Sequence, residues 1–443
     1  MKKLAVLFLA LVMVIGVLSA CGRDSDSSSG KASSGGDSSQ SAKGNSSKNE
    51  SGNSSKITAP KPDHLLIWAD QEKEAGLKPA VKSFEKKFGI DVKYKTMDIA
   101  SKLRKQLRLD GPAGTGPDVF TVPHDQIGQL AVQGLVRPID VPKSVTDIYT
   151  KSSIQAETYK GKLYGLPKTV ETPILMYNKK YIKQPPKTFK ELWKLSEKLK
   201  AKGKYGFLFL GDNYYFAHAY MAAYGGYVFK NKNGTLDPTD LGINNAGAVK
   251  GAEWIAKWYK QGLFPDGIVG KNGGSAMNGL WTDGKVASKN DGPWAYESSE
   301  KAGLKFGAAP LPKLPNGKYP ETFIGVKGWQ VSAFTKHPQW ATKLVVWLSN
   351  KKNSKIRYQN TGEIPPIKSL INDPIIKDNP KSKAVFVQAQ RGEPMPNIPE
   401  MSQVWGPMAS ALQEIVTGKS DAKTALDEAA KTINTKIKQL NSK

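Results

Sequence analysis

The sequence is poor in the residues that build disulfides and metal centres. It contains one cysteine, Cys21, and four histidines in 443 residues. A single cysteine cannot form a disulfide within the chain, and no cysteine cluster is present for zinc. The histidines, at positions 64, 124, 218 and 337, show no ligand spacing. We therefore expect no metal and no other cofactor, which argues against iron capture.

Apolar runs long enough to cross a membrane are also missing after the N-terminus. Lys2 and Lys3 precede an apolar stretch over residues 4–17, and Leu18-Ser19-Ala20-Cys21 closes it with small residues. This is the pattern of a secretory signal peptide over residues 1–20, and it is shorter than the roughly 20 apolar residues that a membrane span needs. We expect the mature protein to be secreted and soluble.

The segment that begins at Cys21 predicts a lipid anchor followed by a tether. Cys21 follows the small-residue pattern and resembles the lipobox of bacterial lipoproteins, in which the cysteine is acylated. Residues 22–62 consist mostly of Ser, Gly, Asn, Lys and Asp, which cannot bury enough apolar surface to order the chain. We expect attachment to the extracellular face of the cell membrane through the lipid alone, and the tether length suits a Gram-positive envelope.

Acidic residues are too few to balance the basic ones. Lys and Arg number 65 against 39 Asp and Glu, a formal charge of +26. The lysines are spread along predicted helices with Glu191 and Glu197 between them, and no nucleic-acid-binding motif accompanies them. We therefore expect solvated faces or attraction to an anionic cell wall, and no nucleic-acid partner.

Strand and helix patterns alternate along the mature chain. The apolar run 65–68 predicts a buried strand, the spacing from Ala80 to Phe88 predicts a helix that Gly89 ends, and the runs 91–94 and 118–122 predict two more strands. Thr188 and Glu191 form a capping box for a further helix. This alternation predicts an α/β fold with mostly parallel sheets flanked by helices.

Ligands of such sheets bind at the carboxyl ends of the strands. The loops that follow three predicted strands, 69–73, 123–126 and 170–172, each carry a carboxylate or an amide. Aromatic residues come from the segments 213–216, 292–296 and 404–405, and Trp294 follows a Gly-Pro turn that tends to expose it. Charged planar groups can hydrogen-bond sugar hydroxyls, and aromatic rings can lie on the apolar faces of pyranose rings. The pattern is typical of a sugar-binding site.

Ten stretches, in the same order along the chain, resemble the maltose/maltodextrin-binding proteins of ABC importers. They are Leu66-Ile67-Trp68; Phe84-Glu85-Lys86 with Gly89-Ile90; His124-Asp125 with Gly128; Gly161-Lys162-Leu163 with Val170-Glu171; Tyr177-Asn178-Lys179; Pro185-Pro186-Lys187-Thr188; Gly225-Gly226-Tyr227; Asn245-Ala246-Gly247-Ala248; Gly292-Pro293-Trp294-Ala295; and Met395-Pro396-Asn397-Ile398-Pro399 with Met401-Ser402 and Trp405. The resemblance covers nearly the whole mature length.

The resemblance implies a two-lobed, type II periplasmic-binding-protein fold with a hinged cleft between the lobes. By matching segments, residues 63–170 and 327–362 would form lobe one, and residues 171–326 and 363–443 would form lobe two. The protein would be no enzyme. It would capture maltose or maltodextrins in the cleft and deliver them to the permease subunits of an ABC importer, a task that suits a monomer.

The family's sugar contacts fall, position by position, on seven residues of this sequence. They are Glu72, Lys73, Asp125, Glu171, Tyr215, Trp294 and Trp405. Asp125 and Glu171 would accept hydrogen bonds from sugar hydroxyls, Lys73 would donate, and the three aromatic residues would stack on the sugar rings. Glu72 stands where the family pattern has an aspartate.

Five other positions depart from the family pattern. Val122 stands in place of a stacking tryptophan, Gln126 in place of an arginine and Asn213 in place of a glutamate, while Gly406 and Ala409 replace a tyrosine and an arginine. These losses predict weaker binding of maltose than of maltotriose or longer chains. They also leave cyclodextrins or another oligosaccharide open as ligands.

Two other classes of protein share parts of the pattern. A glycosidase also places carboxylates and aromatic residues in a cleft, with its acid pair about 5 to 9.5 Å apart. A cell-wall-binding protein would use the basic excess, and salt would weaken its binding to anionic polymer. The lipoprotein signal and the resemblance along the whole chain favour a solute-binding protein over both.

Overall fold

The computed structural model describes residues 57–232 and 235–442. The predicted signal peptide, Cys21 and most of the predicted tether lie outside the described residues. The residues just before the first strand are described and lie against helix α11 (Pro338–Ser349), where the backbone N–H groups of Thr58 and Ala59 donate to Gln339 Oε1. Thr58 and Ala59 lie within residues 22–62, the segment predicted as a tether. Over the described ranges no helix combines the length and the apolar character that a membrane crossing requires.

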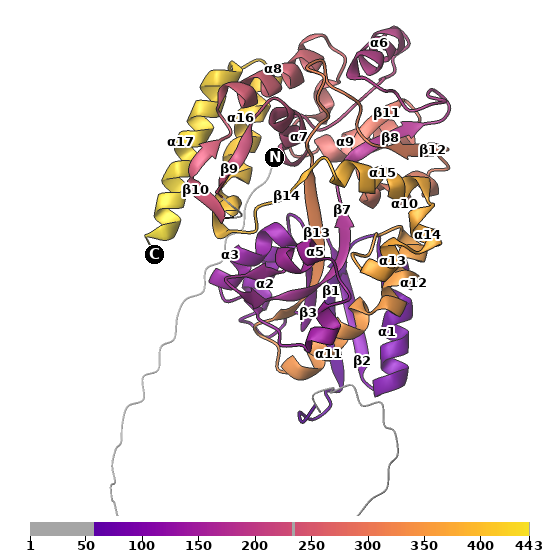
Figure 1. Cartoon of the computed structure of the whole chain (residues 1–443), viewed down its shortest axis with the longest axis vertical. Coiled ribbons are helices and arrows are strands. Elements are labelled where there is room, and N and C mark those ends of the chain that lie inside the picture. The colour runs from indigo at the N-terminus through magenta and orange to yellow at the C-terminus, as the bar shows by residue number, and fades with distance from the viewer. Residues whose placement is uncertain (1–56, 233–234, 443) are drawn as a thin grey trace, which may run out of the picture. The chain divides into compact units, whose positions relative to one another are not determined.

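Seven strands form the larger of two principal sheets (Figure 1). They are β1 (His64–Asp70), β2 (Asp91–Met97), β3 (Val119–Pro123), β4 (Val136–Arg137), β7 (Gly165–Glu171), β13 (Phe323–Ser332) and β14 (Glu393–Pro394). β1 pairs in parallel with β2 and β3, and β14 in parallel with β13. β13 runs antiparallel to β3, β4 and β7.

The smaller sheet has the order β11-β8-β12 and is antiparallel throughout. Its strands are β8 (Ile174–Asn178), β11 (Ser288–Asp291) and β12 (Phe306–Ala309). The prediction of mostly parallel sheets is therefore wrong. Strands β1 to β3 do follow helical crossovers and are parallel, but β13 enters the larger sheet from the opposite direction, because the chain returns there from the smaller sheet.

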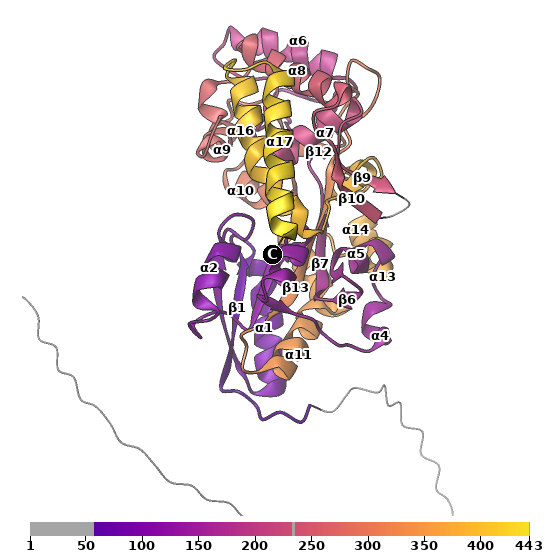
Figure 2. The same ribbon diagram turned by 90° about the vertical axis from the view of Figure 1, so that its left-hand side faces the viewer.

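Helices and short hairpins surround the two sheets. Next to the larger sheet are α1 (Glu74–Phe88), α2 (Leu103–Asp110), α3 (Ile127–Val132), α4 (Lys143–Thr146), α5 (Lys151–Ala156), α11, α12 (Lys351–Thr361) and the hairpin β5 (Thr158–Tyr159) with β6 (Lys162–Leu163). Next to the smaller sheet are α6 (Phe189–Lys200), α7 (Tyr214–Ala223), α8 (Ala246–Lys260), α9 (Gly273–Thr282), α10 (Tyr296–Lys301), α15 (Pro380–Ala389), α16 (Trp405–Val416), α17 (Ala422–Asn441) and the hairpin β9 (Tyr227–Lys232) with β10 (Thr235–Gly242). Short helices α13 (Lys368–Ile371) and α14 (Pro374–Lys377) link α12 to α15. In Figures 1 and 2 the two groups lie apart from each other, and β7 and β13 run between them.

The predicted helix boundaries rest on caps that the structure contains. α1 ends at Gly89, whose backbone adopts the left-handed conformation (φ 65°) and donates its N–H to the carbonyl of Glu85. Such a conformation favours glycine because it has no Cβ. At the start of α6, the Thr188 side chain accepts from the backbone N–H of Glu191, as the capping box predicts.

Two clusters of buried apolar side chains form the core. The smaller cluster lies on one face of the larger sheet and contains Trp68, Phe120, Val122 and Leu103. The larger cluster continues through the elements around both sheets. The tryptophans of α8 and α11 belong to it or pack against it, as expected from their helical spacing.

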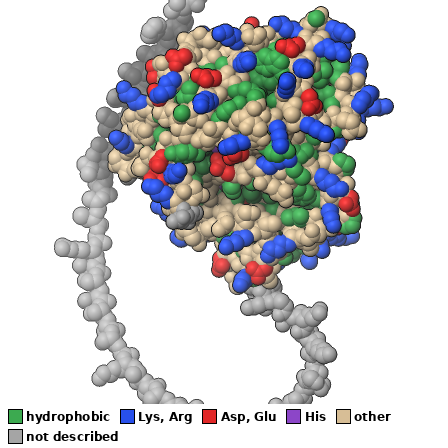
Figure 3. Space-filling view, turned by 45° about the horizontal axis from the view of Figure 1, so that its top comes forward, with side chains coloured by type: hydrophobic (Ala, Val, Ile, Leu, Met, Phe, Trp, Pro, Cys, Tyr) green, Lys and Arg blue, Asp and Glu red, His purple; other side chains and the backbone are tan. Residues whose placement is uncertain are grey.

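The charged side chains follow no single patch on the face drawn in Figure 3. Lys and Arg side chains are scattered over it with Asp and Glu between them. This distribution agrees with the interpretation of the basic excess as solvated faces.

Candidate ligand-binding cleft

A cavity of about 800 Å³ lies between the elements of the larger and the smaller sheet. It is lined by all seven residues that the sequence analysis selected: Glu72, Lys73, Asp125, Glu171, Tyr215, Trp294 and Trp405. Its position follows from the chain path, since β7 ends at Glu171 and β8 begins at Ile174 in the other sheet. The carboxyl ends of β1, β3 and β7 therefore meet where the chain passes from one sheet to the other.

The wall next to the larger sheet is predominantly polar. Residues 70–73 after β1 line it together with Asp98, Ser101 and Arg104. Glu72 has a positive φ of 61°, which is uncommon for a residue with a side chain and costs about 1–2 kcal/mol. Lys73 is only 5% exposed, and its ammonium lies 3.8 Å from Glu297 of α10, so this ion pair joins the two sides of the cleft.

All four aromatic residues of the cavity lining come from the wall next to the smaller sheet. Tyr215 and Phe216 come from α7, Trp294 from the 3₁₀ turn Pro293–Ala295, and Trp405 from the start of α16. The rings of Tyr215 and Trp294 are 5.9 Å apart, and Tyr215 stacks on Phe323 behind it. Trp294 and Trp405 are only partly buried and pack against the core. These rings can therefore present faces to a ligand while their other sides are held.

Asp125 connects the two walls. It lies in the 3₁₀ turn His124–Gln126 after β3, and its carboxylate is hydrogen-bonded by Trp405 of the aromatic wall. Burial raises the pKa of Asp125 to about 7, and the Trp405 bond and the positive charge of Arg104 offset only part of this effect. The carboxylate therefore changes its protonation state close to neutral pH.

Lys327 of β13 forms the charged floor of the cleft. Its ammonium lies 2.9 Å from Asp70 and 3.1 Å from Glu171, and all three residues line the cavity. Burial alone would lower the pKa of Lys327, but the two carboxylates raise it well above its ordinary value. Burial raises the pKa of Glu171, and Lys327 opposes that rise. Glu171 is thus held in place by an ion pair before any ligand contacts it.

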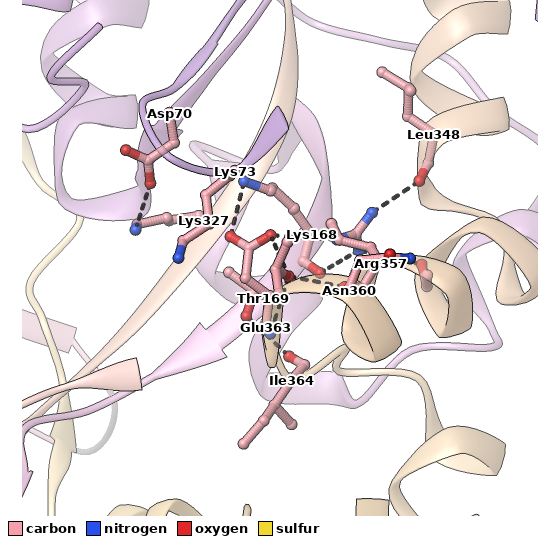
Figure 4. A network of polar contacts seen from close by, with 12 residues as sticks. Asp70, Lys73, Lys168, Thr169, Lys327, Leu348, Arg357, Asn360, Glu363 and Ile364 are labelled. Carbon is pink, nitrogen blue, oxygen red and sulfur yellow. Dashed lines mark hydrogen bonds and ion pairs between the residues drawn. The ribbon is translucent and has the colours of Figure 1, made fainter. Parts of the chain in front are cut away.

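A second set of buried charges lies behind this floor (Figure 4). Lys168 of β7 and Glu363 form an ion pair of 2.9 Å in which both side chains are at most 5% exposed. Arg357 of α12 donates to the backbone carbonyls of Lys168 and Leu348. Burial alone would raise the pKa of Glu363, but Lys168 and Arg357 lower it to about 2. This set fastens α12 and the segment after it to β7, at the point where β7 leaves the larger sheet.

Several residues of the cleft have no counterpart among the sequence-based candidates. Arg104, Lys327 and Asp291 are charged residues that line the cavity. Lys327 follows Gly325-Val326 in an apolar strand, a placement that could have flagged a buried charge. Arg104 lies on α2 between exposed Lys102 and Lys105, so its sequence context resembles a solvated face.

The positions that depart from the family pattern fall into two groups. Gln126, Asn213 and Gly406 line the cavity. Val122 is fully buried in the smaller core cluster, and Ala409 is exposed on α16; neither lines the cavity. The change at Val122 therefore affects core packing and the change at Ala409 affects the surface, whereas the change at Gln126 affects the cleft itself.

Comparisons with known proteins place this architecture in a family. The model of the bacterial extracellular solute-binding proteins matches residues 79–384, and the chain belongs to that family. The resemblance seen in the sequence and the two-lobed α/β fold with its cleft are thereby confirmed. The family match also makes the chain a binding protein of a transport system rather than an enzyme.

Three proteins that are similar to this chain are named for the oligosaccharides they bind. The galactooligosaccharide-binding protein of Bacillus subtilis (strain 168) is 49% identical over 86% of this chain and 91% of its own length. The maltodextrin-binding protein MdxE of the same strain is 37% identical over 80% and 86%. A crystal structure of a cyclo/maltodextrin-binding protein with maltotetraose is 42% identical, covers 86% of this chain and 99% of its own, and has a TM-score of 0.73.

Proposed function

We propose that this protein captures a neutral oligosaccharide in the cleft and delivers it to the permease subunits of an ABC importer. The observation that carries the proposal is the convergence of Glu72, Lys73, Asp125, Glu171, Tyr215, Trp294 and Trp405, from separate segments, on one cavity. Carboxylates and ammonium groups on one wall suit sugar hydroxyls, and aromatic rings on the other suit the apolar faces of pyranose rings.

Maltodextrin is the ligand that the residue pattern favours. The seven contact positions keep the residues of the family pattern, except that Glu72 stands in place of an aspartate. The maltodextrin-binding protein MdxE and the cyclo/maltodextrin-binding protein solved with maltotetraose support this choice, and each matches most of this chain.

A galactooligosaccharide is the second candidate, and one observation favours it. The galactooligosaccharide-binding relative is more similar to this chain than MdxE is, 49% against 37% identity. Gln126, Asn213 and Gly406 line the cavity where the maltodextrin pattern has arginine, glutamate and tyrosine. Changes at contact positions alter which hydroxyls a cleft recognises.

For the two lobes that would close on the sugar we propose the boundaries expected from the sequence. Residues 63–170 and 327–362 would form lobe one, and residues 171–326 and 363–443 would form lobe two. The crossings would lie near Glu171, near Gly325 and near Pro365. The direct step from β7 into β8 and the length of β13 support the first two crossings. Hinge closure of this kind brings both walls onto the ligand.

Lipid anchoring of a monomer through Cys21 completes the proposal. Two relatives in Streptococcus pneumoniae carry the name maltooligosaccharide ABC transporter solute-binding lipoprotein, which supports an anchor of the same kind. Replacing Cys21 by Ala should release the protein into the medium of a Gram-positive host without changing its sugar affinity. Equal membrane association of the Cys21→Ala variant and the unchanged protein would refute the anchor.

The ligand is tested by a thermal-shift screen followed by calorimetric titration. Maltotriose, maltotetraose, galactotriose, α-cyclodextrin and an unrelated trisaccharide would be compared at equal concentration. A ligand that binds only the folded state raises Tm, so the matching sugar should give the largest shift. A maltodextrin-binding protein responds to the maltooligosaccharides, a galactooligosaccharide-binding protein responds to galactotriose, and no response to any sugar refutes the proposed function.

A further inference from the structure

Arg104 has the only guanidinium in the cavity lining, and its side chain is not used by the fold. It is partly exposed, and no hydrogen bond or ion pair joins its side chain to any other described residue. Arg357 in the buried set behind the floor is the contrast, since its guanidinium donates to two backbone carbonyls and to Ser354. The five donors of Arg104 are therefore available to a ligand.

The helix that carries Arg104 is fixed in place by two contacts. Its neighbours Leu103 and Leu107 are fully buried in the smaller core cluster. The loop before α2 is closed by Asp98, whose carboxylate accepts from the backbone N–H groups of Ala100 and Ser101. Asp98 and Ser101 themselves line the cavity, so contacts within the protein hold this part of the polar wall in place before a ligand binds.

Gln126 contributes to the same construction. Its side-chain amide donates to the carbonyl of Ala100 at 3.2 Å and so braces the loop before α2. Gln126 is the position at which the maltodextrin-binding pattern has an arginine. In this chain Gln126 supports the loop before α2. The guanidinium that reaches the cleft belongs instead to Arg104, in the first turn of α2.

We propose that Arg104 supplies the guanidinium of the cleft in place of the arginine lost at position 126, and that it binds two adjacent hydroxyls of one sugar unit. This inference rests on the proposed function. The planar fork of an arginine donates two parallel hydrogen bonds, which fits a vicinal diol better than a single ammonium does. Asp125 lies near enough to feel the charge of Arg104, and its carboxylate can accept a hydrogen bond from a hydroxyl that Arg104 contacts.

The chain offers a matched control one helical turn away. Arg108 lies four residues after Arg104 on α2, is exposed, and does not line the cavity. Replacing either arginine by methionine removes the same positive charge and the same hydrogen-bond donors. Only the Arg104→Met variant removes donors from the cleft.

The experiment is calorimetric titration of the lipid-free mature chain and its variants with the oligosaccharide that binds best in the screen, maltotriose or galactotriose. Arg104→Met should weaken Kd by about 10- to 100-fold, the range expected for hydrogen bonds to a charged donor. Arg104→Lys should recover part of the loss, and Arg108→Met should leave Kd unchanged. Tm of the free protein should be nearly the same in all three, because the Arg104 side chain makes no hydrogen bond or ion pair with the described residues that its replacement would break.

A second readout separates ligand contact from a distant structural effect. Removing the positive charge next to Asp125 raises the pKa of that carboxylate further, so the pH at which binding is half lost should move upward in Arg104→Met and stay in place in Arg108→Met. Equal affinities of the two methionine variants would overturn the inference while leaving the proposed function intact. Failure of the unchanged protein to bind any sugar of the screen would instead overturn the proposed function, and the inference with it.

Discussion

The two walls of the cleft solve different parts of sugar recognition. The wall next to the larger sheet consists of carboxylates, ammonium groups and a guanidinium on the loops after β1 and β3 and on α2. The wall next to the smaller sheet supplies all the aromatic rings of the lining, from α7, α16 and the turn at Trp294. Hydrogen bonds to charged groups depend on direction and on protonation, whereas stacking depends on buried apolar area.

This division makes closure of the cleft necessary for tight binding. A sugar on either wall alone gains only one kind of contact, and its other face stays in water. The pair Lys73–Glu297 and the hydrogen bond from Trp405 to Asp125 join the walls, so three of the side chains proposed to contact the ligand also hold the two sides together. The following four predictions separate the contributions, beginning with the largest effect.

Removing a charge from behind the cleft should damage stability rather than binding. Glu363→Gln leaves Lys168 buried without its carboxylate, which costs about 3–5 kcal/mol of unfolding free energy. The folded-state pKa of Glu363 lies at about 2, below its ordinary 4.5, so this stability is present above about pH 4.5 and is lost as the pH falls toward 2. Urea unfolding at pH 7 measures the loss.

The control for that variant is Glu300→Gln, which breaks an exposed pair with Lys381. An exposed pair contributes at most about 1 kcal/mol. Equal unfolding free energies for the two variants would show that the buried set contributes no more than a surface pair. The sugar affinity of the folded fraction should be close to normal in both.

Truncating the aromatic wall should reduce affinity at every pH. Trp294→Ala and Trp405→Ala should each weaken binding by about 1–3 kcal/mol, the range for a large apolar contact. Trp193→Ala, on α6 outside the cavity lining, is the control. Titration calorimetry gives the affinities and thermal unfolding gives Tm; a collapsed Tm with unaltered affinity would assign the cleft tryptophans to the core.

Chain length should matter because part of the polar wall is missing. Maltose should bind at least about tenfold more weakly than maltotriose, since one lost charged hydrogen bond is worth about 1.5–3 kcal/mol and about 1.4 kcal/mol makes a factor of ten. Of the two positions that replace an arginine, Gln126 lines the cavity and Ala409 does not, so Gln126 carries this expectation. Titration with maltose, maltotriose and maltotetraose checks it; equal affinities would mean that another group, such as Arg104, fully replaces the arginine.

The smallest effect is a pH dependence that belongs to the polar wall. Asp125 has a folded-state pKa of about 7 against an ordinary 3.8, so its contribution to stability is full below about pH 3.8 and is lost as the pH rises through 7. Sugar binding has the opposite sign, because hydroxyls donate to the ionised form. Affinity should fall about twofold from pH 8 to pH 7.

Binding should also release a proton near pH 7, which calorimetry in buffers of different ionisation enthalpy detects. Asp125→Asn should abolish both the proton release and the pH dependence, and Trp294→Ala should keep both. A pH dependence that persists in Asp125→Asn would assign it to another group, such as Glu171.

The sequence could predict those parts of the site that follow the ends of strands. Asp125 comes two residues after β3 and Glu171 is the last residue of β7, and such ends meet at one edge of a sheet. Arg104 could not be found in this way, because on α2 it stands among Lys102, Lys105 and Arg108 and only burial of Leu103 decides which side faces the cleft.

Local sequence patterns also could not predict the buried charges and the strand directions. Lys168 and Glu363 are far apart in the chain, and each resembles a solvated residue until the fold brings them to 2.9 Å. The prediction of mostly parallel sheets failed because the alternation of strands and helices describes β1 to β3 but not the return of the chain into β13. The lobe boundaries and the sugar contacts remain predictions for the experiments above.

β13 limits how this protein can change during evolution. Its ten residues pair with β3, β4, β7 and β14, and Lys327 reaches the cleft from the middle of the strand. Because side chains alternate between the faces of a strand, inserting one residue before Lys327 would turn its ammonium away from Asp70 and Glu171 and shift its pairing with the neighbouring strands. The loop residues 71–73 and 98–101 lie outside the strands, so a change in their length does not shift a strand register. New sugar specificities should therefore accumulate as insertions and exchanges in those loops, while the length of β13 stays fixed.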